Sequence, residues 1–214
     1  MKIVITGGNR GIGAGLATAY RARGDDVIAT ARQPDMGTSL DVADPASFPH
    51  FKTALGDAPV DLLICNAAVY LDRGETLETG YTPADWAHSF AVNVTGVFLT
   101  IQSLLSNVRG AKPGKIAIIS SQMASSTRAP GGSYIYRASK AAVLNLGRNL
   151  ATDLRQDGVA VGIYHPGWVT TDMGGPRADI GVDDAVSGLV REFDALNIAS
   201  TGCFRTWDGR DHAY

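Results

Sequence analysis

The sequence predicts an α/β protein in which a mostly parallel, doubly wound sheet is covered by helices on both faces. Short apolar, β-branched runs alternate along the chain with longer stretches of helical periodicity. A glycine-rich turn follows the first of these runs, and 25 of the 214 residues are glycine. No linker, repeat or shift in composition divides the chain, so we expect a single domain over residues 1–214.

The first third of the chain alternates strand and helix patterns. Residues 2–6 form a β-branched run, a helical stretch follows the glycine-rich turn, and residues 26–31 are typical of a second buried strand. These elements make a βαβ unit. A short strand near residues 38–42, a helical stretch over 45–56 and an apolar strand over 60–66 continue the alternation.

The rest of the chain repeats the same alternation with longer helices. We expect one helix from about Pro83 to Val108, because Pro83 suits a first turn and apolar residues follow at near-helical spacing. Residues 114–120 then predict a strand. A second long helix is expected from about Ser133 to Gln156, followed by Gly158 in a left-handed cap. The remaining expected elements are a strand with its turn at 159–167, a helix at 182–196 and a closing strand at 202–209.

Composition and charge argue against several classes of function. Charged residues make up 19% of the chain and the net charge is −2, which lacks the basic footprint of a nucleic-acid binder or a polybasic membrane anchor. No apolar run reaches the roughly 18 residues of a membrane span, and no cationic leader precedes the first strand. Cys65 and Cys203 have neither CxxC spacing nor neighbouring histidines, so we expect no disulfide framework and no metal. A cytoplasmic protein with a small-molecule partner fits these features best.

The turn after the first predicted strand has the spacing of a dinucleotide-binding loop. Thr6, Gly7, Gly11 and Gly13 form the pattern TGxxxGxG. Glycines at such positions let backbone amides and a helix N-terminus approach a pyrophosphate. The alternative is a turn that only packs a helix against a strand, and the motif by itself names no reaction.

The end of the second predicted strand indicates which dinucleotide binds. Sites that prefer NAD usually place an acid here, but residues 30–33 read Thr-Ala-Arg-Gln. Arg32 offers a planar fork suited to a 2'-phosphate, and Arg10 in the glycine loop adds a second positive charge. This favours NADP(H), against the alternative of two solvated arginines. Asp41, at the tip of the third strand, is expected to face the adenine, with Val42 beside it.

Tyr136 and Lys140 are candidates for proton transfer. They stand four residues apart, so on one helix face the ammonium lies beside the phenol and favours its ionised form. The unperturbed pKa of a phenol is about 10, so transfer near neutral pH needs such help. Tyr134, six positions from Lys140, lies on a different face. Taken alone, a pair with this spacing is more often a surface feature than a catalytic one.

Six motifs together resemble the short-chain dehydrogenase/reductase family along nearly the whole chain. They are TGGNRGIG at 6–13, CNAA at 65–68, AVNVTG at 91–96, ISS at 119–121, YRASK at 136–140 and PGWVTTDM at 166–173. The stretch GCFRTWDGRD at 202–211 is similar to the C-factor or sniffer-type carbonyl reductase branch. The resemblance implies a Rossmann fold whose seven strands lie in the order 3-2-1-4-5-6-7.

The resemblance also implies catalytic roles. Tyr136 is expected to protonate a carbonyl oxygen as hydride reaches its carbon, and Lys140 to lower the Tyr136 pKa and bind the nicotinamide ribose. Ser121 is expected to donate a hydrogen bond to the substrate oxygen. Asn93 is expected to hold a water that links Lys140 to solvent. Without the resemblance, Asn93 is as well explained by backbone hydrogen bonds at a helix irregularity, and Ser121 by a turn at a strand end.

Further cofactor contacts follow from the same resemblance. Asn66 and Ala67 are expected beside the adenine ribose, and Val169 and Thr171 near the nicotinamide carboxamide. The other expected contacts are Ile12, Pro166 and Gly167. Two departures from the family pattern stand out: CNAA replaces the usual NNAG, and residues 131–133 look like a small insertion between Ser121 and Tyr136. Neither removes a reacting group.

The sequence therefore predicts an NADP(H)-dependent oxidoreductase of a carbonyl or secondary alcohol. The alternative is a nucleotide-sensing or signalling protein without physiologically important turnover, which the retention of all four catalytic groups disfavours. We expect a homodimer or homotetramer, because the two long helices correspond to those that pair subunits in this family. Met123, Trp168 and Met173 are candidates to line a substrate pocket, whereas His165 is expected to be packed or solvated.

Overall fold

The computed structural model describes residues 1–33 and 38–214, and its seven-stranded sheet has the order β3-β2-β1-β4-β5-β6-β7. Every pair of neighbouring strands is parallel. The strands are β1 (Lys2–Ile5), β2 (Asp26–Ala31), β3 (Thr38–Ser39), β4 (Leu62–Cys65), β5 (Gly114–Ile119), β6 (Val159–His165) and β7 (Phe204–Thr206). The predicted fold class and strand order are confirmed.

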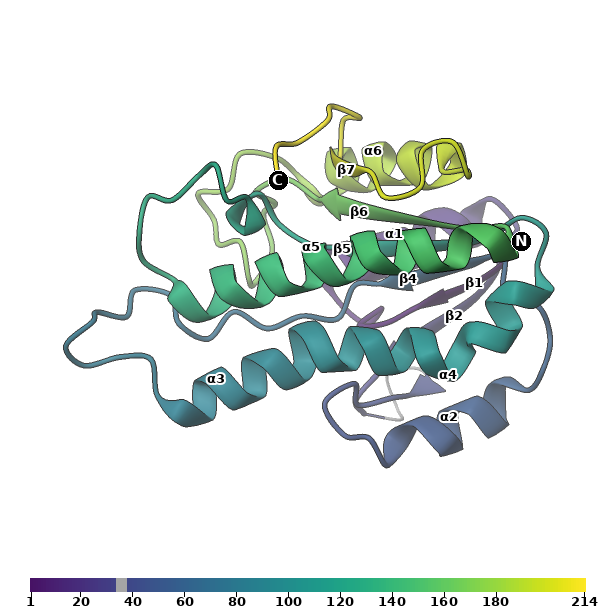
Figure 1. Ribbon diagram of the computed structural model, residues 1–214, viewed down its shortest axis with the longest axis horizontal. Helices are drawn as coiled ribbons and strands as arrows, with labels where there is room; N and C mark the ends of the chain where they lie inside the picture. The colour runs from purple at the N-terminus through teal and green to yellow at the C-terminus, as the bar shows by residue number, and fades with distance from the viewer. Residues whose placement is uncertain (34–37) are drawn as a thin grey trace.

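Helices cover both faces of this sheet (Figure 1). They are α1 (Gly11–Ala22), α2 (Ser47–Leu55), α3 (Pro83–Phe90), α4 (Gly96–Gly110), α5 (Tyr134–Leu154) and α6 (Val182–Ala195). Successive residues of β1 point to opposite faces: Val4 joins the core under α2, α4 and α5, while Ile3 and Ile5 join the core under α1 and α6. Because both faces are buried, the central strands are continuous apolar runs rather than alternating ones.

The first long helix contains an irregularity at Asn93, the position where the alternative explanation of that residue placed one. It begins as expected at Pro83, where the Thr82 hydroxyl accepts the Asp85 backbone N–H at 3.2 Å. A π-helical segment, η2 (Ala91–Thr95), then joins α3 to α4, and the helix ends at Gly110. Each π turn holds more residues than an α turn, so side chains beyond it point in new directions. The expected uninterrupted helix is therefore corrected to two α segments with a π turn between them.

By length and composition, the stretch Pro83–Gly110 is apolar enough to cross a membrane. In this fold, however, Val97, Ile101 and Leu104 are buried in the core against the sheet. Burial of one apolar side in this way is typical of a helix in the interior of a soluble protein.

The second long helix, α5, lies near its predicted bounds and follows an unusual turn. Gly131, Gly132 and Ser133 all have positive φ, at 84°, 69° and 50°. The helix ends in a 3-10 turn, and Gly158 has φ of 74°, which confirms the predicted left-handed cap. The segment noted as an insertion thus carries the chain into α5 through three successive residues with positive φ.

Several expected strands are shorter than predicted, most clearly the third, the fourth and the last. The third ends at Ser39 because the chain turns at Asp41, whose carboxylate accepts the Ala43 backbone N–H at 2.9 Å. The last is reduced to Phe204–Thr206, because Gly202 and Gly209 on either side have φ of 85° and 87°. Positive φ lies outside the extended region, so it ends the strand.

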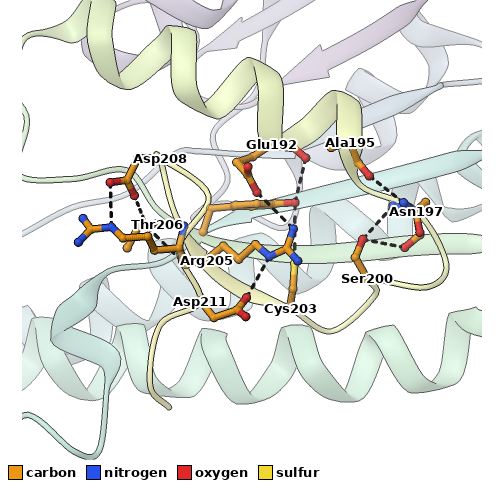
Figure 2. A network of polar contacts seen from close by, with 11 residues as sticks. Glu192, Ala195, Asn197, Ser200, Cys203, Arg205, Thr206, Asp208 and Asp211 are labelled. Carbon is orange, nitrogen blue, oxygen red and sulfur yellow. Dashed lines mark hydrogen bonds and ion pairs between the residues drawn. The ribbon is translucent and has the colours of Figure 1, made fainter.

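The segment after β7 is held to the body of the protein by charged and polar contacts (Figure 2). Arg205 lies between two acids, at 3.5 Å from Glu192 of α6 and 3.1 Å from Asp211. Arg210 pairs with Asp208 at 2.8 Å. Strand β7 pairs with the end of β6, so these contacts stabilise the edge of the sheet beside the loop that follows β6.

Candidate active site

The glycine loop after β1 is shaped by close contacts that exclude side chains. Gly7 and Gly11 have φ of 64° and 52°, in the region that favours glycine. A Cβ on Gly13 would clash with the Gly7 carbonyl oxygen and the side-chain nitrogen of Asn66. The glycines therefore let the loop pack closely against its neighbours, and Gly7 and Gly11 line the space above the sheet, where a phosphate-binding loop would meet its ligand.

Two polar side chains tie this loop to the end of β4. The buried Thr6 hydroxyl accepts the backbone N–H groups of Asn66 and Ala67 at 3.0 and 3.1 Å. In return, Asn66 Nδ2 donates to the carbonyl oxygens of Thr6 and Gly7, both at 3.1 Å. Thr6 and Gly13 thus shape the loop without lining the cavity beside it.

A first cavity of about 560 Å³ crosses the carboxyl ends of the central strands. Such sheets bind ligands at this edge. The expected site residues that line it are Gly7, Arg10, Gly11, Ile12, Arg32, Asp41, Val42, Asn66, Ala67, Tyr136, Lys140, Pro166 and Thr171. The fold therefore brings together residues from the loops after β1, β2, β3, β4 and β6 with two residues of α5.

The two arginines of this cavity lie in different settings. Arg32 is exposed at the end of β2 and forms no ion pair with any residue of the described chain. Arg10 lies 3.3 Å from the Asp172 carboxylate on the loop after β6. Arg10 therefore bridges two loops across the cavity, and Arg32 is the arginine whose charge is left for a ligand.

Tyr136 and Lys140 are both buried on α5, with Lys140 Nζ 5.7 Å from the centre of the Tyr136 ring. Lys140 Nζ donates to the Ile119 carbonyl oxygen at 3.0 Å. Burial lowers the pKa of Lys140 to about 8. Burial also raises the pKa of Tyr136 to about 12, and a hydrogen bond with Ser121 works against that rise. The net shift of the Tyr136 pKa is therefore upward, because desolvation outweighs the other influences on the phenol, and a lowering by Lys140 stays a prediction.

Ser121 follows β5 and begins the 3-10 turn η3 (Gln122–Ala124), where its Oγ accepts the Met123 backbone N–H at 3.1 Å. It therefore has both a turn role and, through its contact with the Tyr136 phenol, a place beside the candidate acid. The two interpretations of this residue are compatible.

Asn93 lies in the π turn, is 0% exposed and lines neither cavity of the site. Its Oδ1 accepts the Val69 N–H and its Nδ2 donates to the Val69 carbonyl, both at 2.9 Å. Nδ2 also donates to Ser139 Oγ at 3.0 Å. Both Nδ2 hydrogens are used and one accepting lone pair of Oδ1 remains, so the side chain mainly joins the π turn to the loop after β4, and its water-holding role stays a prediction.

A second cavity, of about 330 Å³, adjoins the first at Tyr136. Its lining includes the expected pocket residues Met123, Trp168 and Met173, together with Ser121, His165, Gly167 and Val169. Gly167 and Val169, which were expected as cofactor contacts, line this second cavity, and their contact with a cofactor stays a prediction. His165 is packed, as expected: it is 8% exposed, burial lowers its pKa to about 4, and its Nδ1 has no hydrogen-bond partner among the described residues.

The loop after β4 supplies three residues that sequence reasoning missed. Tyr70 stacks on Tyr136 with ring centres 4.3 Å apart and the planes at 22°. Asp72 accepts backbone N–H groups at the start of α5, and Arg73 lies 4.9 Å above the Tyr70 ring. These residues follow the CNAA motif but belong to no motif themselves, so nothing in the sequence pairs them with a helix more than 60 residues away.

Tyr134 behaves as helix geometry suggested. It lies edge-on to Tyr81 with ring centres 5.1 Å apart and lines neither cavity. Among the residues that the structure describes, no group of three or more histidine, cysteine or acidic side chains is arranged to hold a metal ion.

The chain belongs to the short-chain dehydrogenase family, whose model matches residues 1–179. The C-signal protein of Myxococcus xanthus is 37% identical over 162 residues, covering 75% of this chain and 96% of that protein. The NADPH-bound carbonyl reductase from chicken fatty liver has a TM-score of 0.91 at 29% identity, covering 100% of this chain and 98% of that one. The carbonyl reductase Sniffer of D. melanogaster shares the fold, with a TM-score of 0.91 at 24% identity over 100% and 99% of the two chains. The predicted family and its C-factor and sniffer-like branch are confirmed.

Proposed function

We propose that this protein is an NADP(H)-dependent oxidoreductase that transfers hydride between nicotinamide and a carbonyl or secondary alcohol. The observation that carries the proposal is the meeting of two cavities at one buried tyrosine. The larger cavity is lined by the glycine loop, and the smaller one has Ser121 beside the Tyr136 phenol. A family of NAD(P)-dependent oxidoreductases and an NADPH-bound carbonyl reductase relative support the same function.

The residues of the first cavity fit a dinucleotide. The backbone of Gly7 and Gly11 and the N-terminus of α1 line this cavity and suit a pyrophosphate. Arg32, exposed and without an acidic partner in the described chain, suits a 2'-phosphate and favours NADP(H) over NAD. Lys140, Pro166 and Thr171 line the same cavity and are the candidates to hold the nicotinamide half.

The bound nicotinamide supplies or accepts the hydride, and the chain supplies the proton. Tyr136 holds its proton at neutral pH because burial raises its pKa to about 12, so it carries the proton that carbonyl reduction requires. Ser121 donates to the carbonyl oxygen and stabilises the charge that develops there. Lys140, with a pKa near 8, is mostly charged at neutral pH and supports transfer of the phenolic proton.

The similarity to a C-signal protein is the observation that favours a second candidate, a nucleotide-sensing or signalling role without important turnover. One experiment separates the two: NADPH oxidation by the purified protein is followed with a panel of aldehydes, ketones and quinones, beside calorimetric titration of NADPH. Turnover well above the Tyr136→Phe variant supports the reductase. NADPH binding without turnover of any carbonyl or alcohol contradicts it and favours the sensor.

We further propose that the protein is a cytoplasmic homodimer or homotetramer, paired through α4 and α5. The support is Phe98, an apolar side chain of α4 that is 40% exposed, together with the correspondence of these helices to those that pair subunits in the family. Light scattering at micromolar concentration should give at least a dimer mass. A monomer mass contradicts this proposal, and Phe98→Glu should shift the wild-type oligomer toward monomer.

A further inference from the structure

The second cavity carries an unbalanced positive charge. Its lining is largely aromatic, methionine, hydroxyl and backbone in character, and it contains no acidic residue and no lysine. His165 is neutral at physiological pH because burial lowers its pKa to about 4. Among the described residues that line this cavity, Arg73 therefore holds the one formal charge at neutral pH.

Arg73 has most of its hydrogen-bonding capacity free. One Nη2 hydrogen is donated to the Met173 carbonyl oxygen across the cavity, which leaves four of the five guanidinium N–H donors. The guanidinium forms no ion pair with any residue of the described chain. The neighbouring carboxylate, Asp72, is buried and bonded to backbone N–H groups of α5. A charged fork without an acid opposite it, at the wall of a cavity, suits an anionic ligand.

The position of Arg73 relative to the reacting centre limits what that ligand can be. The guanidinium carbon lies 4.9 Å above the Tyr70 ring, and Tyr70 stacks 4.3 Å from the Tyr136 ring. Guanidinium, Tyr70 and Tyr136 thus follow one another along one wall. A molecule whose carbonyl oxygen reaches the Tyr136 phenol can extend along this wall and place a second group, a few bonds away, at Arg73.

We propose that Arg73 determines substrate specificity by binding a carboxylate, so that the preferred substrates are oxo acids whose ketone or aldehyde lies a few bonds from the carboxylate. This rests on the carbonyl reduction proposed above. The carboxylate is unchanged in the reaction: the carbonyl carbon accepts the hydride, the carbonyl oxygen takes the Tyr136 proton, and the C=O becomes a secondary or primary alcohol. A carboxylate matches the two parallel donors of the guanidinium fork, whereas a neutral ester does not.

A matched pair of substrates tests this assignment. In 4-oxo-4-phenylbutanoate and its methyl ester, two methylene groups separate the ketone from the carboxyl group, so the reactivity of the ketone is nearly the same. With saturating NADPH, we expect the kcat/KM of the wild type to favour the acid by about tenfold or more, the range of hydrogen bonds to a charged group. Arg73→Met should remove that preference by lowering kcat/KM for the acid while leaving the ester within about threefold.

Controls separate recognition of charge from a structural role. Arg177→Met removes an exposed charge from the loop after β6, outside both cavities, and should keep the wild-type preference. Calorimetry with 4-phenylbutanoate, which cannot react, should show binding to wild type that Arg73→Met loses. Arg73→Lys should keep part of the preference, since it retains the charge without the fork.

Three results would overturn the assignment. The first is an equal kcat/KM of the wild type for the acid and the ester. The second is a fall in kcat/KM in Arg73→Met that is the same for both substrates. The third is failure of the wild type to reduce the oxo acid. The second result would mean that Arg73 only joins the cavity walls through Met173. If simple aldehydes and ketones are still reduced in any of these cases, carbonyl reduction stands and the specificity assignment alone fails.

Discussion

The carboxylate of Asp72 accepts the backbone N–H of Tyr136, the candidate catalytic acid, from a loop 64 residues earlier in the chain. Asp72 is 1% exposed, and its Oδ2 also accepts the Ile135 N–H at 2.8 Å. The first N–H groups of a helix lack partners within it, and an anion is favoured there. Ser133, the residue before α5, makes no capping bond of its own. The buried carboxylate therefore caps the helix that carries Tyr136.

We expect Asp72→Ala to destabilise the protein by about 1–3 kcal/mol, because it leaves helix N–H groups unsatisfied in a buried setting. It should also lower kcat for carbonyl reduction, while the Kd for NADPH changes little. Urea unfolding, steady-state kinetics and calorimetry measure the three quantities. Asp72→Asn keeps an accepting oxygen and should recover part of the loss in stability and part of the loss in kcat. An equal kcat in Asp72→Ala and wild type would show that the cap does not position Tyr136.

Replacing Tyr136 by Phe should lower carbonyl reduction at least about a hundredfold, the contribution typical of a positioned acid. NADPH affinity should be nearly unchanged, because one hydroxyl is removed and the ring still packs on Tyr70. Tyr134→Phe is the matched control, since Tyr134 lines neither cavity. The measurement is NADPH consumption at saturating cofactor, and full activity in Tyr136→Phe would refute the mechanism.

NADPH should bind more tightly than NADH, with Arg32 responsible for most of the difference. Losing its charge-assisted bonds to a 2'-phosphate should cost about 1–3 kcal/mol in Arg32→Ala. Arg10→Ala is expected to change the preference less, because Arg10 is engaged with Asp172 at 3.3 Å. Calorimetry of the wild type and each variant with NADPH and with NADH measures the Kd values that are compared. An Arg32→Ala protein with wild-type NADPH affinity would contradict the assignment.

Carbonyl reduction should fall as pH rises through about 8. Lys140 has its pKa lowered to about 8 by burial and loses its positive charge there, whereas Tyr136, with a pKa raised to about 12, remains protonated. The profile of kcat/KM against pH should therefore have a descending limb near 8 that belongs to Lys140. Residual activity of Lys140→Arg should lack that limb, since arginine stays charged; an unchanged limb would assign it to another group.

The same two shifts predict how stability depends on pH. The folded pKa of Lys140 is below its ordinary 10.5, so the unfolded chain binds more protons between about 8 and 10.5 and stability should rise over that range. The pKa of Tyr136 is raised in the folded protein, so the contribution of this residue to stability is complete below about pH 10 and is lost as the pH rises toward 12. Urea unfolding of the wild type and Lys140→Met at pH 7, 9 and 10 checks the rise in stability with pH, which the variant should lack.

Local patterns in the sequence predicted the fold class, and the resemblance of six motifs to a known family supplied the strand order and the main reacting groups of the candidate site. Continuous apolar runs such as residues 60–66 predict parallel strands because both sides of such strands are covered. The spacing of Tyr136 and Lys140 places them on one helix face, since residues four apart always meet on an α-helix. These relationships span a few residues and depend on periodicity alone. Whether residues 1–214 form one independent domain stays a prediction.

Tertiary structure decided the partners of those groups. The cap from Asp72 on α5, the stacking of Tyr70 on Tyr136 and the bridge from Arg10 to Asp172 join segments from 63 to 162 residues apart. No periodicity encodes such contacts, because they depend on where loops lie once the sheet has assembled. The pKa values of Tyr136 and Lys140 were likewise decided by burial, since desolvation depends on the surrounding layers of the fold rather than on neighbours in sequence.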